Sequence, residues 1–431
     1  MWSDAVKFMR ALKAEDLGFK IAVLYLVFSY LRPQVLLPWL SFVPWTQLVI
    51  LAGLIYILLY RKLSLQGGHY LVLMFYMIIL ISAWNSQYPS VSFSKIDIVG
   101  IWLLEMVFFT NIIKNIRQYW LLTVVLFVIL FKMSLFGAKT WAMRGFGFTK
   151  WGIAGPDGFF SNSGEYSLLM AMLAVWSLAF ILRHENKSRL YYLLPITAVM
   201  SVLGASSRGG QLALIAGLLY LAFVVGRLRI KTLFYIVLSG WLIYQVIPEE
   251  QKERFESMGS DNTSVSRVIY WKSGLDMLQK YPLTGVGYNA FPEYFHDHYS
   301  FLLEKDDFLS SRKEVSHNTY IQMASNLGYP GIAVYLAMIY LLFRYTRKSL
   351  VYARDDAQKE ETWMVYNLYG LEAALVTYLI GSTFMSVGYY PYIYLLFMFV
   401  MPMYKFNREF VREKIRKSRK IGDVTSTLNN R

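Results

Sequence analysis

The chain has 431 residues, of which 56% are hydrophobic and only 16% are charged, and its mean hydropathy is +0.38. A soluble globular protein carries roughly a quarter charged residues, so this composition predicts an all-α protein that crosses a membrane many times. There is no cysteine, which excludes disulfides, zinc–thiolate sites and thiol nucleophiles. The net charge is +15, but the basic residues lie in short segments between apolar runs, so we expect no nucleic-acid partner.

The apolar runs are each close to the ~20 residues that a helix needs to cross a bilayer. We therefore expect about twelve transmembrane helices. Their approximate bounds are 17–31, 47–60, 69–83, 96–113, 119–136, 164–182, 190–204, 209–226, 231–247, 319–343, 363–387 and 389–404.

Lysine and arginine are concentrated in one set of alternate connections, such as 61–62, 183–189 and 344–359. The positive-inside rule places these connections, and with them both termini, in the cytoplasm. The long polar interval from Pro248 to Gly331 then lies outside. The basic tail is either a further topology signal or a segment attracted to anionic lipid headgroups.

This topology divides the chain into four parts. Residues 1–247 form an N-terminal bundle of nine spans, and 248–318 form one large periplasmic loop that contains short helices. Residues 319–404 form three C-terminal spans, and 405–431 form a basic cytoplasmic tail.

Within the loop, apolar residues at helical spacing predict a helix that Thr263 or Ser264 caps and that turn residues after Tyr281 end. We expect its apolar face, with Val265 and Val268, to lie on the membrane surface. Arg267 falls in its first turn, and is either a solvated charge or part of a site.

Arg208 lies at the outer tip of a tight hairpin between two spans. A cation at a helix N-terminus opposes the helix dipole unless an anion is present, so a phosphate site would be built in this way. The alternative is an arginine that extends to headgroup phosphates.

His317 follows Ser316, which we expect to cap the next span, so the imidazole should lie in a first helical turn. That position favours the neutral ring, the form that can accept a proton from a hydroxyl. The alternative is a capping-region histidine that faces headgroups.

Two further places in the sequence give weaker evidence of a functional site. Glu293, His296, Asp297 and His298 match no strong metal signature, so we expect an exposed loop helix and no metal. Glu165 enters the sixth span from outside, where a carboxyl indicates either a lined cavity or a stabilised helix start.

These segments together resemble the O-antigen ligase and polymerase superfamily of bacterial inner membranes. The resemblance rests on the order and spacing of Ser206–Gly210, Arg267 with Trp271, Pro282 with Gly285–Gly287, and His317–Tyr320 with Gly328–Gly331. Arg32-Pro33-Gln34 is similar to one subgroup of this family.

The resemblance implies a GT-C-like membrane fold and a metal-independent, inverting glycosyltransferase without a cofactor. The donor would be a glycan on undecaprenyl pyrophosphate, and the acceptor a hydroxyl on lipid A–core, another glycan or a protein. Arg208 and Arg267 would bind the pyrophosphate, and His317 would orient or deprotonate the acceptor. Further expected substrate contacts are Trp271, Asn318, Tyr320, Glu165 and Arg144.

The same motifs fit a ligase, a polymerase and a protein glycosyltransferase. A lipid flippase that uses both arginines to hold phosphate is the main rival, although the sequence lacks the paired broken helices of inverted-repeat transporters. A structural scaffold for polysaccharide export is the third alternative.

Overall fold

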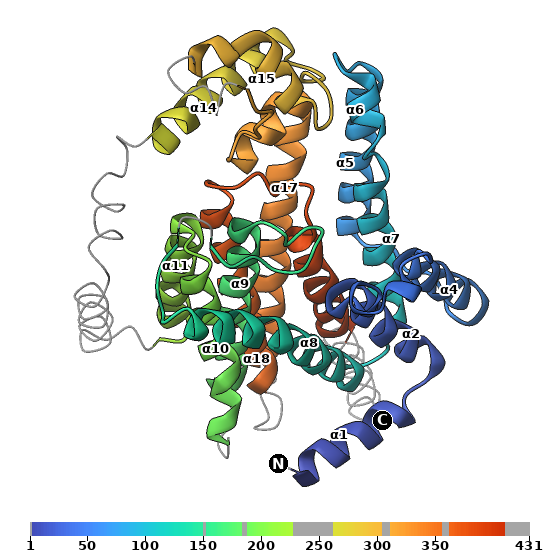
Figure 1. Cartoon of the computed structure of the whole chain (residues 1–431). Coiled ribbons are helices and arrows are strands. Elements are labelled where there is room, and N and C mark those ends of the chain that lie inside the picture. The colour runs from blue at the N-terminus through green and yellow to red at the C-terminus, as the bar shows by residue number, and fades with distance from the viewer. Residues whose placement is uncertain are drawn as a thin grey trace, which may run out of the picture.

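In the computed structural model, the described residues are 2–149, 152–182, 188–226, 262–303, 311–355 and 362–409, and every regular element among them is a helix (Figure 1). This confirms the all-α prediction. The expected span 231–247 and the tail beyond residue 409 lie outside these residues. Every other expected span coincides with a helix.

The N-terminal part contains α1 (Trp2–Ala14), α2 (Leu17–Leu26), a π-helical turn (Val27–Leu31), α3 (Pro33–Leu36), α4 (Trp45–Tyr60), α5 (Gly67–Trp84), α6 (Pro89–Phe93), α7 (Asp97–Ile112), α8 (Ile116–Met143), α9 (Ser163–Leu182), α10 (Leu193–Gly204) and α11 (Arg208–Val224). The C-terminal part contains α14 (Asn262–Lys280), α15 (Phe291–Tyr299), α17 (Thr319–Asp355), α18 (Thr362–Gly381) and a last helix over 391–409.

Among the described residues, four helices are long and apolar enough to cross a membrane, namely α5, α8, α9 and α17. Shorter apolar helices cover Leu17–Leu31, Trp45–Tyr60, Arg189–Gly204 and Arg208–Val224. The chain is therefore a membrane protein, and the number of twelve spans stays a prediction.

Several expected bounds are wrong. The expected span 363–387 ends at Gly381, and residues 382–390 form no regular helix before Pro391 starts the next one. Conversely, α17 continues to Asp355 and the last helix runs past residue 404, because lysine and arginine end an apolar run without disfavouring a helix.

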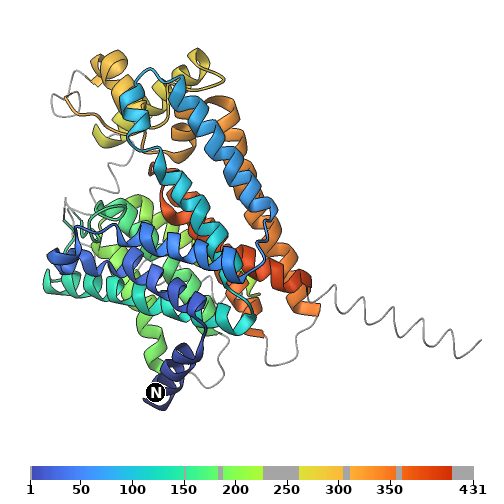
Figure 2. The ribbon, with the colours of Figure 1, turned by 90° about the vertical axis from the view of Figure 1, so that its right-hand side faces the viewer.

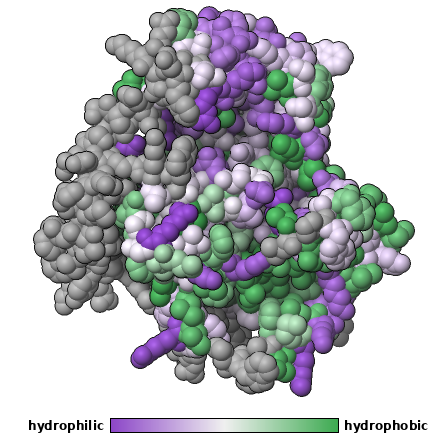
Figure 3. All heavy atoms as spheres, in the orientation of Figure 1, coloured by the Kyte–Doolittle hydropathy of each residue, from purple (hydrophilic) through white to green (hydrophobic). Residues whose placement is uncertain are grey.

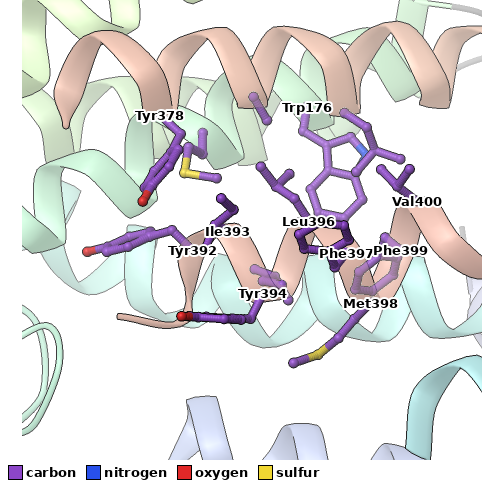
Figure 4. Packing of buried hydrophobic residues seen from close by; sticks show 14 of the residues in the cluster. Trp176, Tyr378, Tyr392, Ile393, Tyr394, Leu396, Phe397, Met398, Phe399 and Val400 are labelled. Carbon is purple, nitrogen blue, oxygen red and sulfur yellow. The ribbon is translucent and has the colours of Figure 1, made fainter. Parts of the chain in front are cut away.

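The last helix lies at the centre of the molecule. Almost every residue from Tyr392 to Met403 is less than 5% exposed, on all sides of the helix. Trp176 of α9 packs edge-on against Phe399 with ring centroids 5.0 Å apart, and Tyr378 of α18 lies 6.0 Å from Tyr392 (Figure 4). A helix that is apolar on all sides can be surrounded by lipid or by protein, and this helix is surrounded by protein.

Glycines allow α11 to approach this core closely. A Cβ on Gly217 would lie 2.0 Å from Thr377 Oγ1 of α18 and 3.0 Å from Val175 Cγ1 of α9. A Cβ on Gly210 would lie 2.0 Å from Ser167 Oγ of α9. Small residues at such crossings let helix backbones pack directly, which is how helices associate in membranes.

The helices α5 and α17 run side by side and form another extensive contact (Figure 2). Ser82 Oγ near the end of α5 donates to Asn326 O near the start of α17, at 2.8 Å, whereas Gly67 at the start of α5 faces Tyr345. The two helices are therefore antiparallel. α17 is kinked at Gly328, whose φ of 69° is not helical.

The helices α14 and α15 lie together at one end, over the start of α17 (Figure 1). They have a small core of their own, which includes Tyr270, Met277, Phe291 and Phe295. Figure 3 shows that hydrophilic residues gather over this end, whereas hydrophobic residues are more frequent over the middle of the molecule.

The α14 helix differs from its prediction at its start. It begins at Asn262, so Thr263 and Ser264 lie inside it. Its face against the protein is formed by Tyr270, Gly274 and Met277, and Gly274 approaches Ile321 of α17. Val265, Val268 and Leu275 remain exposed on the other face.

We expect Gly217→Val to destabilise the protein by about 1–3 kcal/mol, because the added atoms overpack the contact with Thr377 and Val175. The measurement is the midpoint of thermal unfolding in detergent. Ile215→Phe is the matched control, since Ile215 on the same helix is 51% exposed. Equal midpoints for the two variants would contradict the close crossing.

Candidate functional site

The segment 382–391 between α18 and the last helix joins the elements that carry the expected site residues. Thr319 at the start of α17 donates its N–H to Ser382 O (2.8 Å) and its hydroxyl to Met385 O (2.7 Å). The same hydroxyl accepts a hydrogen bond from Val387 N at 3.0 Å. Ser316 Oγ lies 3.0 Å from Ser386 Oγ. The chain before α17 is thereby fixed against this segment.

His317 lies immediately before α17 and not in its first turn. Asn318 caps the helix, because its Oδ1 accepts hydrogen bonds from Tyr320 N (2.9 Å) and Ile321 N (3.1 Å). The expected Ser316 cap is therefore wrong. His317 has a left-handed backbone, with φ 49°, which turns the chain into the helix. Its side chain is 30% exposed.

Two side chains adjoin the imidazole. Its Nε2 lies 3.6 Å from Glu314 Oε2, and its ring centroid lies 6.1 Å from that of Tyr270. The imidazole holds the pKa of the Glu314 carboxyl below its usual value. Glu314 is therefore held as a carboxylate beside the ring.

Arg267 projects from α14 close to the same place. It lies one helical turn before Tyr270 and Trp271, on the face that they share. Trp271 Nε1 donates to Ser316 O at 3.1 Å, next to His317. Arg267 is partly buried. The hydrogen bond between Trp271 and Ser316 therefore brings the chain around Arg267 close to the chain around His317.

Arg208 starts α11 on the other side of the segment 382–391. Ser206 has φ 52° and makes the tight turn that was expected, and Ser207 caps α11 by accepting from Gly210 N at 3.4 Å. A Cβ on Gly209 would touch Phe384 at 2.8 Å and Met385 at 3.5 Å. Arg208 thus adjoins the segment whose next residues contact Ser316 and Thr319.

Four further expected substrate contacts have different surroundings. Asn318 serves as a helix cap, and the Tyr320 hydroxyl donates to Leu379 O (3.0 Å) and accepts from Ser382 Oγ (3.2 Å). Glu165 lies in the first turn of α9, beside Gly164, and its backbone O accepts from Tyr392 OH at 2.6 Å.

Arg144 is exposed at the end of α8. The chain that follows it lies on the turn before Arg208, because Thr149 N donates to Ser206 Oγ (3.3 Å) and Ile153 N donates to Gly204 O (3.1 Å). The chain after Arg144 and the turn before Arg208 are thus joined by these two hydrogen bonds.

The glycine-rich motifs around Gly285 and Gly328 are explained by backbone conformation and close packing. Gly285, Gly287 and Gly328 all have positive φ, and a Cβ on Gly285 would lie 2.2 Å from Asn326 C. Val286 N donates to Ser325 O at 2.9 Å across this contact. This contact holds the turn after α14 against the kink in α17. It therefore fixes the position of α14, which carries Arg267, relative to the start of α17, which follows His317.

The acidic and histidine residues around α15 have other partners. Tyr88 OH donates to Asp297 Oδ2 at 2.5 Å, and the His298 ring stacks on Tyr294 at 4.1 Å. In the part of the chain that the structure describes, no three His, Asp or Glu side chains gather as metal ligands.

The sequence-based prediction missed the residues that position His317. Glu314 lies three residues before it, a spacing that was visible, but Tyr270 and Ser386 are remote in sequence and gave no signal. Segment 382–391 lay partly inside an expected span, so its role was hidden.

Comparison with known proteins agrees with this geometry. Residues 193–336 match the family model described as O-antigen ligase. No curated protein matches the chain. The matched residues contain Arg208, Arg267 and His317, together with α10, α11, α14, α15 and the start of α17. Residues 193–336 are thus similar to the O-antigen ligase family, and this match supports the O-antigen ligase superfamily.

Proposed function

We propose that the protein is a periplasm-facing glycosyltransferase of the O-antigen ligase type in the bacterial inner membrane. It transfers a glycan from undecaprenyl pyrophosphate to a hydroxyl on lipid A–core or another surface-glycan acceptor. One observation carries the proposal: Arg208, Arg267 and His317 all belong to the matched domain, and residues near them in the chain contact segment 382–391 or one another, namely Gly209, Trp271 and Ser316.

Arg208 and Arg267 would bind the donor pyrophosphate. The first turn of α11 offers backbone N–H groups beside the Arg208 guanidinium, and such a pair of donors binds phosphate oxygens. Arg267 approaches from α14 on the opposite side. Two fixed cations stabilise the negative charge that grows as the bond between the anomeric carbon and the pyrophosphate oxygen breaks. In this mechanism no metal is required.

His317 would act on the acceptor. The acceptor oxygen attacks the anomeric carbon from the face opposite the leaving pyrophosphate, so the configuration inverts. As the new C–O bond forms, the hydroxyl proton passes to the imidazole, which must be neutral beforehand. Glu314 then stabilises the imidazolium, and the pyrophosphate leaves with its electron pair.

The distribution of polar groups supports the membrane orientation that the positive-inside rule predicts. The hydrophilic end with α14 and α15 would face the periplasm, and both termini would lie in the cytoplasm (Figure 3). Donor and acceptor would then meet on the outer side, with their lipid parts in the membrane.

We expect Arg208→Ala, Arg267→Ala and His317→Ala each to abolish transfer at normal membrane levels, because each removes a charge or a base from the reacting groups. The assay is transfer from an undecaprenyl-linked donor by the purified variants. Lys272→Ala is the control, since Lys272 is an exposed cation on the same helix as Arg267. Wild-type activity in the three variants would overturn the assignment.

The pH profile tests the pairing of Glu314 with His317. The pKa of the Glu314 carboxyl lies below its usual value because of the adjacent imidazole, and Glu314→Gln removes this negative charge 3.6 Å from Nε2. We expect the acid limb of the kcat/KM profile to move to lower pH. An unchanged limb, or a shift to higher pH, would argue against proton uptake by this ring.

Transfer should be insensitive to EDTA, because arginines supply the positive charge. The measurement compares initial rates before and after EDTA treatment and dialysis. Strong inhibition that a divalent ion reverses would instead direct attention to His296 and His298.

A further inference from the structure

A pocket of about 300 Å³ lies apart from the three proposed catalytic residues. Its walls come from the π-helical turn after α2, the start of α4, the first half of α7 and the chain just before α9. We propose that this pocket binds a neutral sugar ring, as a subsite for one residue of a glycan substrate. The identification of the sugar as substrate rests on the proposed function, whereas the binding itself does not.

The buried end of the pocket carries a carboxyl with an unused oxygen. Glu105 of α7 is 1% exposed, and its Oε1 has no hydrogen-bond partner. Leaving a buried acceptor unpaired is costly, so such groups in native proteins normally meet a water or a ligand. A hydroxyl group of a sugar can donate to it.

Gln34 provides a second unused acceptor. Its Nε2 donates to Phe28 O at 2.9 Å, and because a carbonyl oxygen only accepts, this contact fixes the orientation of the amide. The remaining Oε1 is buried and has no partner. Two acceptors that line one pocket favour a ligand with several hydroxyl or amide donors.

Arg32 supplies hydrogen-bond donors to the pocket. Its backbone is left-handed, with φ 52°, and its guanidinium lies against Gly158, where a Cβ would be 2.5 Å from Nη1. Asp97 and Glu105 line the same pocket. Arg32 and Asp97 bring opposite charges to the pocket, which disfavours a phosphate and is compatible with a neutral polyol.

Aromatic rings form the walls. Trp102 is held by a hydrogen bond from Nε1 to Tyr389 O at 3.0 Å, and its ring lies 5.3 Å from that of Phe159. Phe28 and Phe160 are further aromatic lining residues. Rings of this kind present flat apolar surfaces to the C–H faces of a pyranose, while polar groups fix its orientation.

The pocket is connected to the proposed active site through the chain. Pro391, the first residue of the last helix, lines the pocket and ends segment 382–391. A glycan longer than one residue could therefore contact both places. An acyl or isoprenoid chain does not fit this lining, because it would leave both buried acceptors unpaired.

The test is ligand-observed saturation-transfer NMR on the full chain in phosphatidylcholine nanodiscs, without glycoside detergents that would compete. The probes are D-glucose, D-galactose and N-acetyl-D-glucosamine at millimolar concentration. We expect saturable binding of at least one probe. Glu105→Gln should weaken it by about fivefold or more, because an amide N–H replaces the free acceptor. Thr46→Trp should abolish it by filling the pocket.

Glu372→Gln is the matched control, since Glu372 is another buried carboxyl, paired with Arg347 and far from this pocket in sequence; it should leave binding unchanged. Absence of saturable binding to the wild-type protein would overturn the proposal, as would binding that neither pocket variant weakens, or displacement by decanol but not by unlabelled sugar. His317→Ala should keep the binding, which separates this result from the fate of the proposed reaction.

Discussion

The enclosed last helix is the feature on which the rest of the structure depends. Residues 392–403 of this helix are buried on all sides, and α9 and α18 pack against it. The segment 382–391, which leads into this helix, is consequently fixed in position relative to α9 and α18. Thr319, Ser316 and Gly209 pack directly on that segment. The core therefore sets the position of the proposed chemistry.

The proposed division of labour follows from where each cation is attached. Arg208 belongs to the membrane bundle, at the start of a helix whose glycines press against α9 and α18. Arg267 belongs to the polar cap, which the glycine turn fastens to the kink of α17. His317 precedes α17, and its Nε2 lies 3.6 Å from Glu314 Oε2. Donor and acceptor groups are thus carried by different layers that meet at segment 382–391.

The sequence predicted the helices well and their ends less well. Apolar runs specify that a segment is helical and buried, so every described expected span is a helix. Helix ends depend on local hydrogen bonds, which is why Asn318 and not Ser316 caps α17. The tight turn at Arg208 was predictable from its length. The contacts of Tyr270 and Ser386 near His317 depend on tertiary packing and could not be predicted from the sequence. The same is true of the pocket that Glu105 lines.

The most direct test of this account measures binding of undecaprenyl pyrophosphate, without acceptor, to the wild-type protein and to Arg208→Ala, Arg267→Ala and His317→Ala in nanodiscs. If the arginines hold the leaving group and the histidine serves only the acceptor, both arginine variants lose affinity and the histidine variant keeps it. Equal affinity in all four proteins, or a loss that is largest for His317→Ala, would contradict the account.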